Sequence, residues 1–374
     1  TEITGVCYDS RRVKSGDLFV AVRGYESDGH KYIPMAVEKG CAAVLCEEAP
    51  AGNVPYVQTD DSRLGLALAA RNFYGDPSRE MKVIGITGTN GKTTSTYLLK
   101  HVLEKTLGAK VGLIGTIQNM IGDEILHTER TTPESFELER RLSNAVLSGC
   151  EHVIMEASSQ ALKYERTYGV DFAVGAFTNI GEDHISPIEH PTFEDYFASK
   201  LKIFKQSRAA VVNLDMDHVD KVLEAAHVCE RVVTYSLSNT DADVYTTNLV
   251  HGPRGIVASV VTPRFSRDVL VPTPVKFNIS NVLGAIACAE ALGVEEEAIV
   301  HGFEQVRVPG RMEMYPTESG TIVGVVDFAH NGMSLETMLR DLRENYPDRE
   351  LAVAFGATGG KGVDRRETMG IAAG

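Results

Sequence analysis

The fold is decided by residues 83–107, VIGITGTNGKTTSTYLLKHVLEKTL. The apolar run at 83–87 predicts a strand, and apolar residues recur at helical spacing from Leu98 to Leu107 until Gly108 ends the helix. The turn between them is rich in glycine, so its backbone N–H groups are free to point at phosphate oxygens, and the N-terminus of the helix adds partial positive charge. The segment therefore predicts a phosphate-binding loop.

The side chains of this loop suit a nucleoside triphosphate. Lys92 would neutralise the β- and γ-phosphates, and the hydroxyl of Thr93 would hold Mg²⁺. The pattern is a variant of G-x-x-x-x-G-K-[ST], because Ile86 stands where the first glycine belongs and Gly85 comes one place earlier. A turn that only caps a helix would not need a lysine followed by two threonines. We expect the ATP-binding residues of the loop to be Gly88, Thr89, Asn90, Gly91, Lys92, Thr93 and Thr94.

Strands and helices alternate on either side of the loop. Further strands are predicted at 111–117, 152–156 and 172–178, with helix-length segments between them. Such alternation is typical of a mostly parallel sheet covered by helices on both faces, where ligands bind at the carboxyl ends of the strands. We therefore expect an α/β fold.

Breaks in the pattern predict three domains, at 1–78, 79–307 and 308–374. The third is expected to contain a strand at 322–327, a helix at 334–345 and a strand at 351–355, and to be incomplete at Gly374.

Composition narrows the class of protein. A net charge of -14 argues against a nonspecific nucleic-acid binder, because phosphate backbones attract basic surfaces. No apolar run is long enough to span a bilayer, and the first residues, TEITGVCYDSRR, contain no apolar signal region. The six cysteines form no C-x-x-C pair of the kind that marks a zinc or redox site. We expect a cytoplasmic protein, and a monomer.

Acidic, imidazole and basic residues are predicted at the same edge of the sheet as the loop. Glu156 ends one predicted strand, and a carboxylate there suits Mg²⁺. His184 follows another strand, but by itself such a residue is more often a hydrogen-bonding histidine than a metal ligand. Lys200 is one of three candidate site lysines, together with Lys202 and Lys205. Without further information, each of them is expected to be exposed to solvent.

The loop G-T-N-G-K-T-T at 88–94 resembles that of the Mur ligase family, which also includes folylpolyglutamate and cyanophycin synthetases. Further segments resemble the MurE type within that family. These segments are DSR at 9–11, DLFVA at 17–21, DGH at 28–30, TTPE at 131–134 and SSQAL at 158–162. The resemblance implies a three-domain architecture with a central ATP-binding domain and a Rossmann-like third domain, here truncated.

The resemblance also implies roles for individual residues. Glu156 and His184 hold a magnesium ion together with Lys200, which carries a carbamate derived from CO₂. The UDP-muramoyl-dipeptide is contacted by Ser10, Tyr25, Glu26, Ser27, Thr131, Thr132, Ser158 and Arg166. Arg166 also suits this role on chemical grounds alone, because a guanidinium binds a carboxylate or phosphate through two parallel hydrogen bonds. Tyr164 and Gln160 depart from the family pattern and leave the finer contacts to the dipeptide open.

The remaining implied contacts are to ATP. They are Asn281, Arg311, Asp327 and His330, followed by a glycine-rich turn at 356–361 and the basic pair Arg365 and Arg366. For Asn281 there is an alternative: Ser280 or Asn281 could serve only to cap the helix that begins there.

The reaction that the family implies is amide formation. ATP phosphorylates the side-chain carboxylate of D-Glu in UDP-N-acetylmuramoyl-L-Ala-D-Glu, and an amino group of a diamino acid, L-Lys or meso-diaminopimelate, attacks the acyl phosphate. The motif that selects between the two amino acids is expected beyond Gly374. Another ligase of the family, of the MurF type or a folylpolyglutamate synthetase, and a noncatalytic ATP-binding homologue remain the alternatives.

Overall fold

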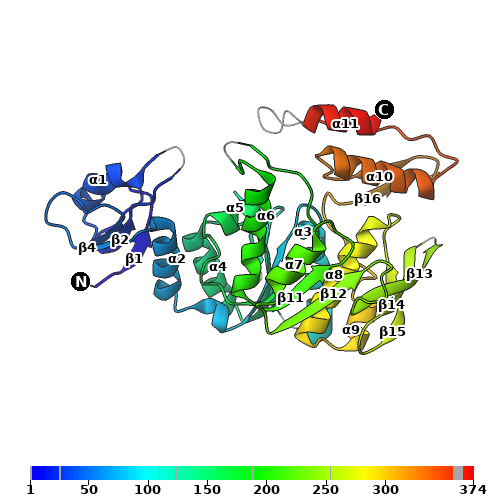
Figure 1. Ribbon diagram of the computed structural model, residues 1–374, viewed down its shortest axis with the longest axis horizontal. Helices are drawn as coiled ribbons and strands as arrows, with labels where there is room; N and C mark the ends of the chain where they lie inside the picture. The colour runs from blue at the N-terminus through cyan, green and yellow to red at the C-terminus, as the bar shows by residue number, and fades with distance from the viewer. Residues whose placement is uncertain are drawn as a thin grey trace.

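The computed structural model describes residues 2–24, 27–108, 110–122, 124–186, 189–252, 254–356 and 365–374. The chain runs through three units, with the blue N-terminal unit at the left of Figure 1 and the orange and red helices at the upper right. The N-terminal unit is a parallel sheet in the order of the sequence. Its elements are β1 (Gly5–Cys7), β2 (Asp17–Val20), η1 (Gly29–Tyr32), α1 (Ile33–Glu38), β3 (Ala43–Cys46), β4 (Tyr56–Gln58) and α2 (Ser62–Phe73).

The central sheet has eleven strands among the described residues, in the order β15-β14-β13-β12-β11-β10-β5-β9-β6-β7-β8. Pairing is parallel from β6 to β13 and antiparallel at both edges. The strands are β5 (Lys82–Thr87), β6 (Lys110–Ile114), β7 (Asn119–Ile121), β8 (Glu124–Leu126), β9 (Cys150–Glu156), β10 (Phe172–Phe177), β11 (Ser207–Asn213), β12 (Arg231–Ser236), β13 (Val244–Gly252), β14 (Gly255–Val261) and β15 (Ser266–Val271). The predicted strands at 111–117, 152–156 and 172–178 are confirmed with small changes at their ends.

Helices cover both faces of this sheet because side chains alternate along its strands. Ile84 and Ile86 pack with helices on one face, and Val83 packs with those on the other. The first face carries α3 (Lys92–Leu107), α8 (Phe277–Leu292) and α9 (Glu296–His301). The second face carries α4 (Ser135–Leu147), α5 (Ser159–Lys163), α6 (Phe193–Leu201) and α7 (Val219–Ala226). Two short 3₁₀ turns, η2 (Pro77–Arg79) and η3 (Lys202–Gln206), complete the unit.

The third unit pairs β16 (Glu313–Pro316) with β17 (Val323–Val326) in an antiparallel hairpin, followed by α10 (Gly332–Asn345) and α11 (Arg365–Ala373). The predicted strand at 322–327 and helix at 334–345 are therefore confirmed. The predicted strand at 351–355 is wrong, because 351–356 pair with no strand of the described chain. Its apolar side chains stay partly in solvent, with Phe355 44% exposed, so the run lacks the neighbours that would make it a strand.

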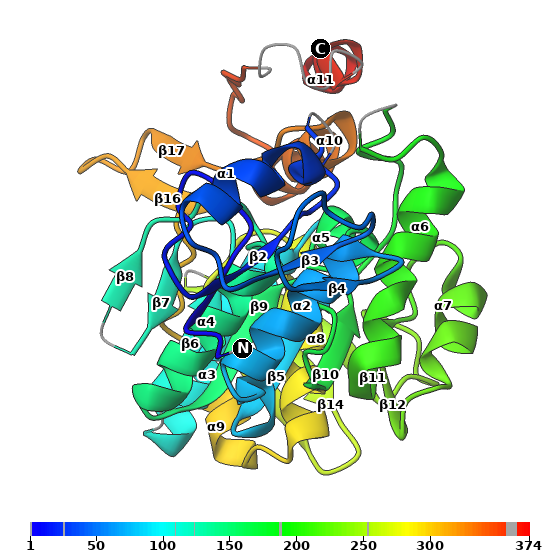
Figure 2. The same ribbon diagram turned by 90° about the vertical axis from the view of Figure 1, so that its left-hand side faces the viewer.

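The topology brings three strand ends together. β5 lies between β9 and β10, and all three run parallel, so their carboxyl ends lie at one edge of the sheet. Figure 2 shows the N-terminal unit in front of the central one, with α10 and α11 above it. No helix within the described residues is both long and apolar enough to cross a membrane.

Candidate active site

The loop after β5 can be built only with glycine at two positions. Gly88 has φ +149°, and a Cβ there would lie 2.0 Å from Oγ1 of Thr178. Gly91 has φ +84°, and a Cβ there would lie 2.2 Å from Oδ1 of Asn281. Both positions combine a backbone conformation that favours glycine with a close polar neighbour. A side chain at either position would therefore require the loop, or its neighbours Thr178 and Asn281, to move.

Two lysines converge on this loop from different helices. Lys92 donates from Nζ to the carbonyl oxygens of Gly88 and Thr89, at 2.8 and 3.0 Å. Lys200, on α6, donates to the same Gly88 oxygen at 2.7 Å. Burial lowers the pKa of Lys92, while the nearby Glu156 carboxylate opposes that change. Both amino groups therefore lie against the loop in which the sequence predicts the phosphates.

Glu156 is a buried carboxylate, 1% exposed, at the end of β9. Its oxygens accept from Oγ1 of Thr93 at 3.0 Å and from the amide and hydroxyl of Thr116 at 2.8 and 3.1 Å. These contacts are neutral, and a buried carboxylate is normally paired with a cation or a metal ion. Carboxylate and hydroxyl oxygens are the donors that Mg²⁺ prefers, so this set of residues fits the predicted ion.

Burial distinguishes Lys200 from its neighbours. Lys200 is 2% exposed and its Nζ lies 4.6 Å from the centroid of the Tyr196 ring. Burial, with a smaller contribution from Lys92, lowers its pKa well below the ordinary value. Lys202 instead pairs with Glu165 at 2.6 Å, and Lys205 is exposed. Of the three candidate lysines, only Lys200 faces the loop.

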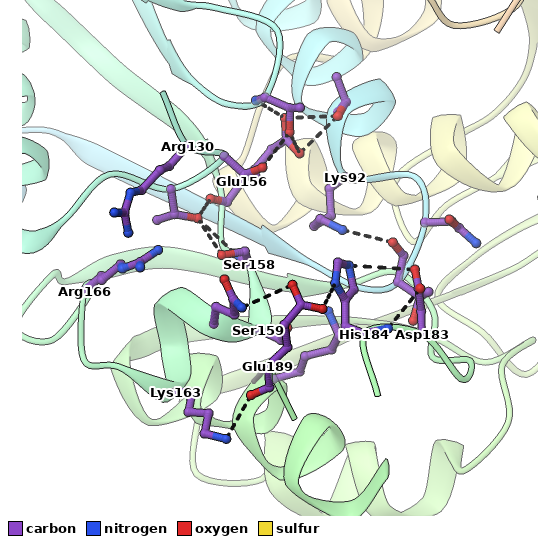
Figure 3. A pocket seen from close by; sticks show the side chains of 18 of the residues that line it. Lys92, Arg130, Glu156, Ser158, Ser159, Lys163, Arg166, Asp183, His184 and Glu189 are labelled. Carbon is purple, nitrogen blue, oxygen red and sulfur yellow. Dashed lines mark hydrogen bonds and ion pairs between the residues drawn. The ribbon is translucent and has the colours of Figure 1, made fainter. Parts of the chain in front are cut away.

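His184 has a strained backbone, with φ +59° for a residue that is not glycine. Its Nδ1 lies 3.2 Å from Oε2 of Glu189, and its Nε2 lies 3.8 Å from Oδ2 of Asp183. Figure 3 shows Lys92, Glu156, Asp183 and His184 lining the same pocket. The described residues contain no group of three or more His, Cys, Asp or Glu arranged to hold a metal. The ion predicted here therefore depends on threonine and lysine as well as on Glu156 and His184.

The third unit contributes the opposite wall. Arg311 donates to Oγ1 of Thr93 at 3.3 Å, and its guanidinium lies 4.5 Å from the centroid of the Phe328 ring. Asp327 accepts from the amides of Met312 and Ala329, and burial raises the pKa of its carboxyl group. Burial lowers the pKa of the His330 imidazole and so favours the neutral ring.

One cavity of about 2240 Å³ joins these walls to the N-terminal unit. It is lined by most of the predicted site residues: Ser10, Ser27, Thr89, Asn90, Gly91, Lys92, Thr93, Thr94, Thr131, Thr132, Glu156, Ser158, Arg166, His184, Lys200, Asn281, Arg311, Asp327 and His330. Gly88 takes part through its carbonyl oxygen. Tyr25, Glu26 and the part of the glycine-rich turn at 357–361 lie outside the described residues.

A chain of polar side chains beside the cavity was missed by sequence reasoning. Ser159 Oγ lies 3.0 Å from Nε2 of His190, whose Nδ1 lies 2.6 Å from Oδ2 of Asp195. Lys163 pairs with the same carboxylate oxygen at 2.7 Å. His190 is completely buried, so its ring is fixed by these partners. The chain ties α5 to α6 and thereby supports the helix that carries Lys200.

The fold and site define a nucleotide-binding enzyme with a phosphate loop in a central parallel sheet. Residues 86–289 match the Mur ligase middle domain, 2–74 match the family's catalytic domain and 310–374 match its glutamate ligase domain. The chain belongs to the Mur ligase family and is an ATP-dependent amide ligase.

Similar proteins and structures bear the same family names. A UDP-N-acetylmuramoyl-L-alanyl-D-glutamate–2,6-diaminopimelate ligase of Clostridium botulinum is 39% identical over 99% of this chain and 76% of its own length. Its counterpart in Geobacter metallireducens is also 39% identical, over 100% and 74%. A solved structure of an enzyme with this name matches with a TM-score of 0.79 at 27% identity, over 99% of this chain and 76% of its own. The MurF ligase of Thermotoga maritima in complex with ADP shares the fold, with a TM-score of 0.62 at 20% identity over 91% and 74%.

Proposed function

We propose that the chain adds 2,6-diaminopimelate, as the third amino acid of the stem peptide, to UDP-N-acetylmuramoyl-L-Ala-D-Glu in peptidoglycan precursor synthesis. The observation that carries the proposal is the shared cavity. The loop at Lys92 and the dipeptide candidates Thr131, Ser158 and Arg166 line one space. The names of the 39% identical relatives support UDP-N-acetylmuramoyl-L-Ala-D-Glu as the acid substrate and 2,6-diaminopimelate as the amine.

The residues support an acyl-phosphate route. A carboxylate is a poor electrophile, so phosphorylation by ATP is needed to supply a leaving group. Lys92 and Arg311 would neutralise charge that develops on the transferred phosphoryl group, and the rigid turn at Gly88 and Gly91 would orient its backbone amides. Arg166 would hold the acid substrate, and closure of the third unit would exclude water from the acyl phosphate. The amino group of the incoming amino acid then displaces phosphate.

Magnesium and a carbamate belong to the same proposal. Thr93, Glu156, His184 and Lys200 would hold Mg²⁺, with Lys200 carrying a carbamate derived from CO₂. When bound, the ion supplies positive charge to the phosphate oxygens. The low pKa of Lys200 supports the modification, because the neutral amine is the form that reacts with CO₂. We place the reaction in the cytoplasm, where ATP and nucleotide-activated sugars are made, and assign it to a monomer.

The test is phosphate release from ATP by the chain as given and by an extended form. Release that requires both UDP-N-acetylmuramoyl-L-Ala-D-Glu and meso-diaminopimelate is the expected result. Equal release with L-Lys would overturn the assignment of the amino acid. Release with a folate substrate or with a UDP-muramoyl-tripeptide would favour another ligase of the family, and ATP binding without turnover in the extended form would favour a noncatalytic homologue.

A further inference from the structure

The carboxylate of Glu134 lies against the guanidinium groups of Arg130 and Arg166, beside the dipeptide candidates of the cavity. Oε1 of Glu134 accepts from Nη2 of Arg166 at 2.9 Å and from Nη1 of Arg130 at 2.7 Å. All three residues line the cavity. Figure 3 shows Arg130 and Arg166 side by side at the edge of the pocket, next to Ser158. A single carboxylate oxygen therefore bridges two arginines at the position proposed for the acid substrate.

Burial makes this pairing important for Arg166. Its side chain is 6% exposed, whereas that of Arg130 is 54% exposed. Burial lowers the pKa of Arg166, and the neighbouring Glu134 charge opposes that change. Nε of Arg166 is buried and has no hydrogen-bond partner among the described residues. Glu134 is thus the counter-ion of a buried guanidinium that is otherwise incompletely paired.

The segment that carries Glu134 is hydrogen-bonded to the residues around Glu156. Thr132 Oγ1 accepts from the Ser158 amide at 3.0 Å and donates to the carbonyl oxygen of Glu156 at 2.8 Å. Thr131 Oγ1 lies 3.0 Å from that of Thr116, which itself donates to the Glu156 carboxylate. Glu134 is the N-cap residue of α4, yet its side chain makes no capping bond to the described residues of that helix. Its carboxylate is directed to the arginines instead.

We propose that Glu134 is a positioning residue for the acid substrate: it fixes the guanidinium of Arg166 so that Arg166 grips an anionic group of the UDP-muramoyl-dipeptide. The inference rests on the proposed function and deepens it. Glu134 occupies one nitrogen of Arg166 and offsets one of the two positive charges, so the trio keeps a net charge of about +1 for a ligand anion. Two unbridged guanidiniums would repel each other and move apart.

The experiment compares Glu134→Ala and Glu134→Gln with the unaltered chain. Glu134→Ala should raise the KM for the UDP-muramoyl-dipeptide about tenfold or more, the scale on which losing one partner of a buried charge pair acts, and leave the KM for ATP within about twofold. Glu134→Gln should lie between, because its amide oxygen still accepts from both arginines without carrying charge. Glu124→Gln is the control. It removes one charge from the exposed strand β8, outside the residues that line the cavity, and should change neither KM by more than about twofold.

A double-substitution cycle separates positioning from general stability. In an Arg166→Ala background, Glu134→Ala should add less than about twofold to the KM for the dipeptide, because the residue through which Glu134 acts is gone. The dissociation constant of the dipeptide, measured by calorimetry without ATP, should follow the same pattern. Independent effects in the two backgrounds, or a lower KM in Glu134→Ala as expected of a competing internal anion, would overturn the inference alone. Absence of dipeptide binding by the unaltered chain would overturn the proposed function with it.

Discussion

Nζ of Lys200 lies 2.7 Å from the carbonyl oxygen of Gly88, so a buried hydrogen bond joins α6 to the phosphate loop across 112 residues of sequence. Lys92 donates to the same oxygen at 2.8 Å. Burial, and to a smaller extent the second lysine, disfavours the charge on Lys200 and lowers its pKa well below the ordinary value. Burial thus favours the neutral amine of Lys200, which is the form that would react with CO₂.

Lys200→Ala should lower kcat for amide formation about 100-fold or more, on the scale of removing one electrostatic group from an active site. Added formate or acetate should restore part of the rate by supplying a small carboxylate, and mass spectrometry of the unaltered chain should find CO₂ on Lys200. Lys202→Ala is the matched control, because that lysine lies outside the cavity lining, where it forms a partly exposed pair with Glu165 and donates to the carbonyl oxygen of Lys163 at 3.4 Å. Full activity of Lys200→Ala without any added acid would sink the carbamate hypothesis.

Glu156→Gln should raise the Mg²⁺ concentration needed for half-maximal rate about tenfold or more. The change removes the buried charge and turns an NH₂ group toward the hydroxyl donors of Thr93 and Thr116. Titration of the rate with Mg²⁺ at saturating ATP measures the effect. An unchanged Mg²⁺ requirement would remove Glu156 from the metal site.

Gly91→Ala should weaken ATP binding about tenfold, because its Cβ would lie 2.2 Å from Oδ1 of Asn281 at a φ of +84°. Gly108→Ala is the control. Gly108 also has a positive φ, +56°, but a Cβ there meets no atom of the described chain within 4 Å. It should cost only about 1 kcal/mol of stability through backbone strain and leave the KM for ATP unchanged. Equal effects of both changes on ATP binding would show that strain alone, and not contact with Asn281, is responsible.

Glu139 should make the stability of the α2–α4 contact depend on pH. This carboxyl group is 2% exposed, and burial, reinforced by Asp76 and opposed by Arg71, raises its pKa to about 8. Between the ordinary value of 4.5 and about 8 the folded state binds more protons than the unfolded state. Stability from this group is therefore present below pH 4.5 and is lost as pH rises toward 8, by at most about 1.4 kcal/mol per pH unit.

Unfolding in urea from pH 5 to 9 measures this effect. Glu139→Gln should flatten the loss of stability across that range, since its amide does not titrate. Glu124→Gln changes net charge equally on the exposed strand β8 and should keep the slope of the unaltered chain. The same slope in Glu139→Gln as in the unaltered chain would contradict the assignment.

Local patterns predicted the part of the site that lies within short stretches of sequence. The strand, loop and helix at 83–107 are contiguous, so their hydrophobic spacing and glycines were enough to predict them. The strand at 351–355 was wrong because a strand depends on a partner that its own sequence does not specify. The strands β11 to β15 received no prediction, although β13 to β15 extend the sheet by antiparallel pairing.

Most of the site features that the sequence did not predict are contacts between residues far apart in the chain. Residue patterns alone left Lys200, Lys202 and Lys205 equivalent. The resemblance to the Mur ligase family pointed to Lys200, and tertiary burial separates it from the other two. His190 carried no signal either, because a histidine in a polar segment reads as exposed until Ser159 and Asp195 are placed against it. The pairing of Glu134 with Arg166 likewise joins segments whose spacing in the sequence does not predict contact.

The position of β5 constrains how the protein can be made on the ribosome. Both of its neighbours, β9 and β10, follow it in the sequence, and β10 ends only at Phe177. The nascent chain must therefore emerge for about another 90 residues after Thr87 before β5 has partners on both sides. During that interval the segment 83–87 has at least one unpaired strand edge, which leaves it open to pairing with other chains or to binding by chaperones.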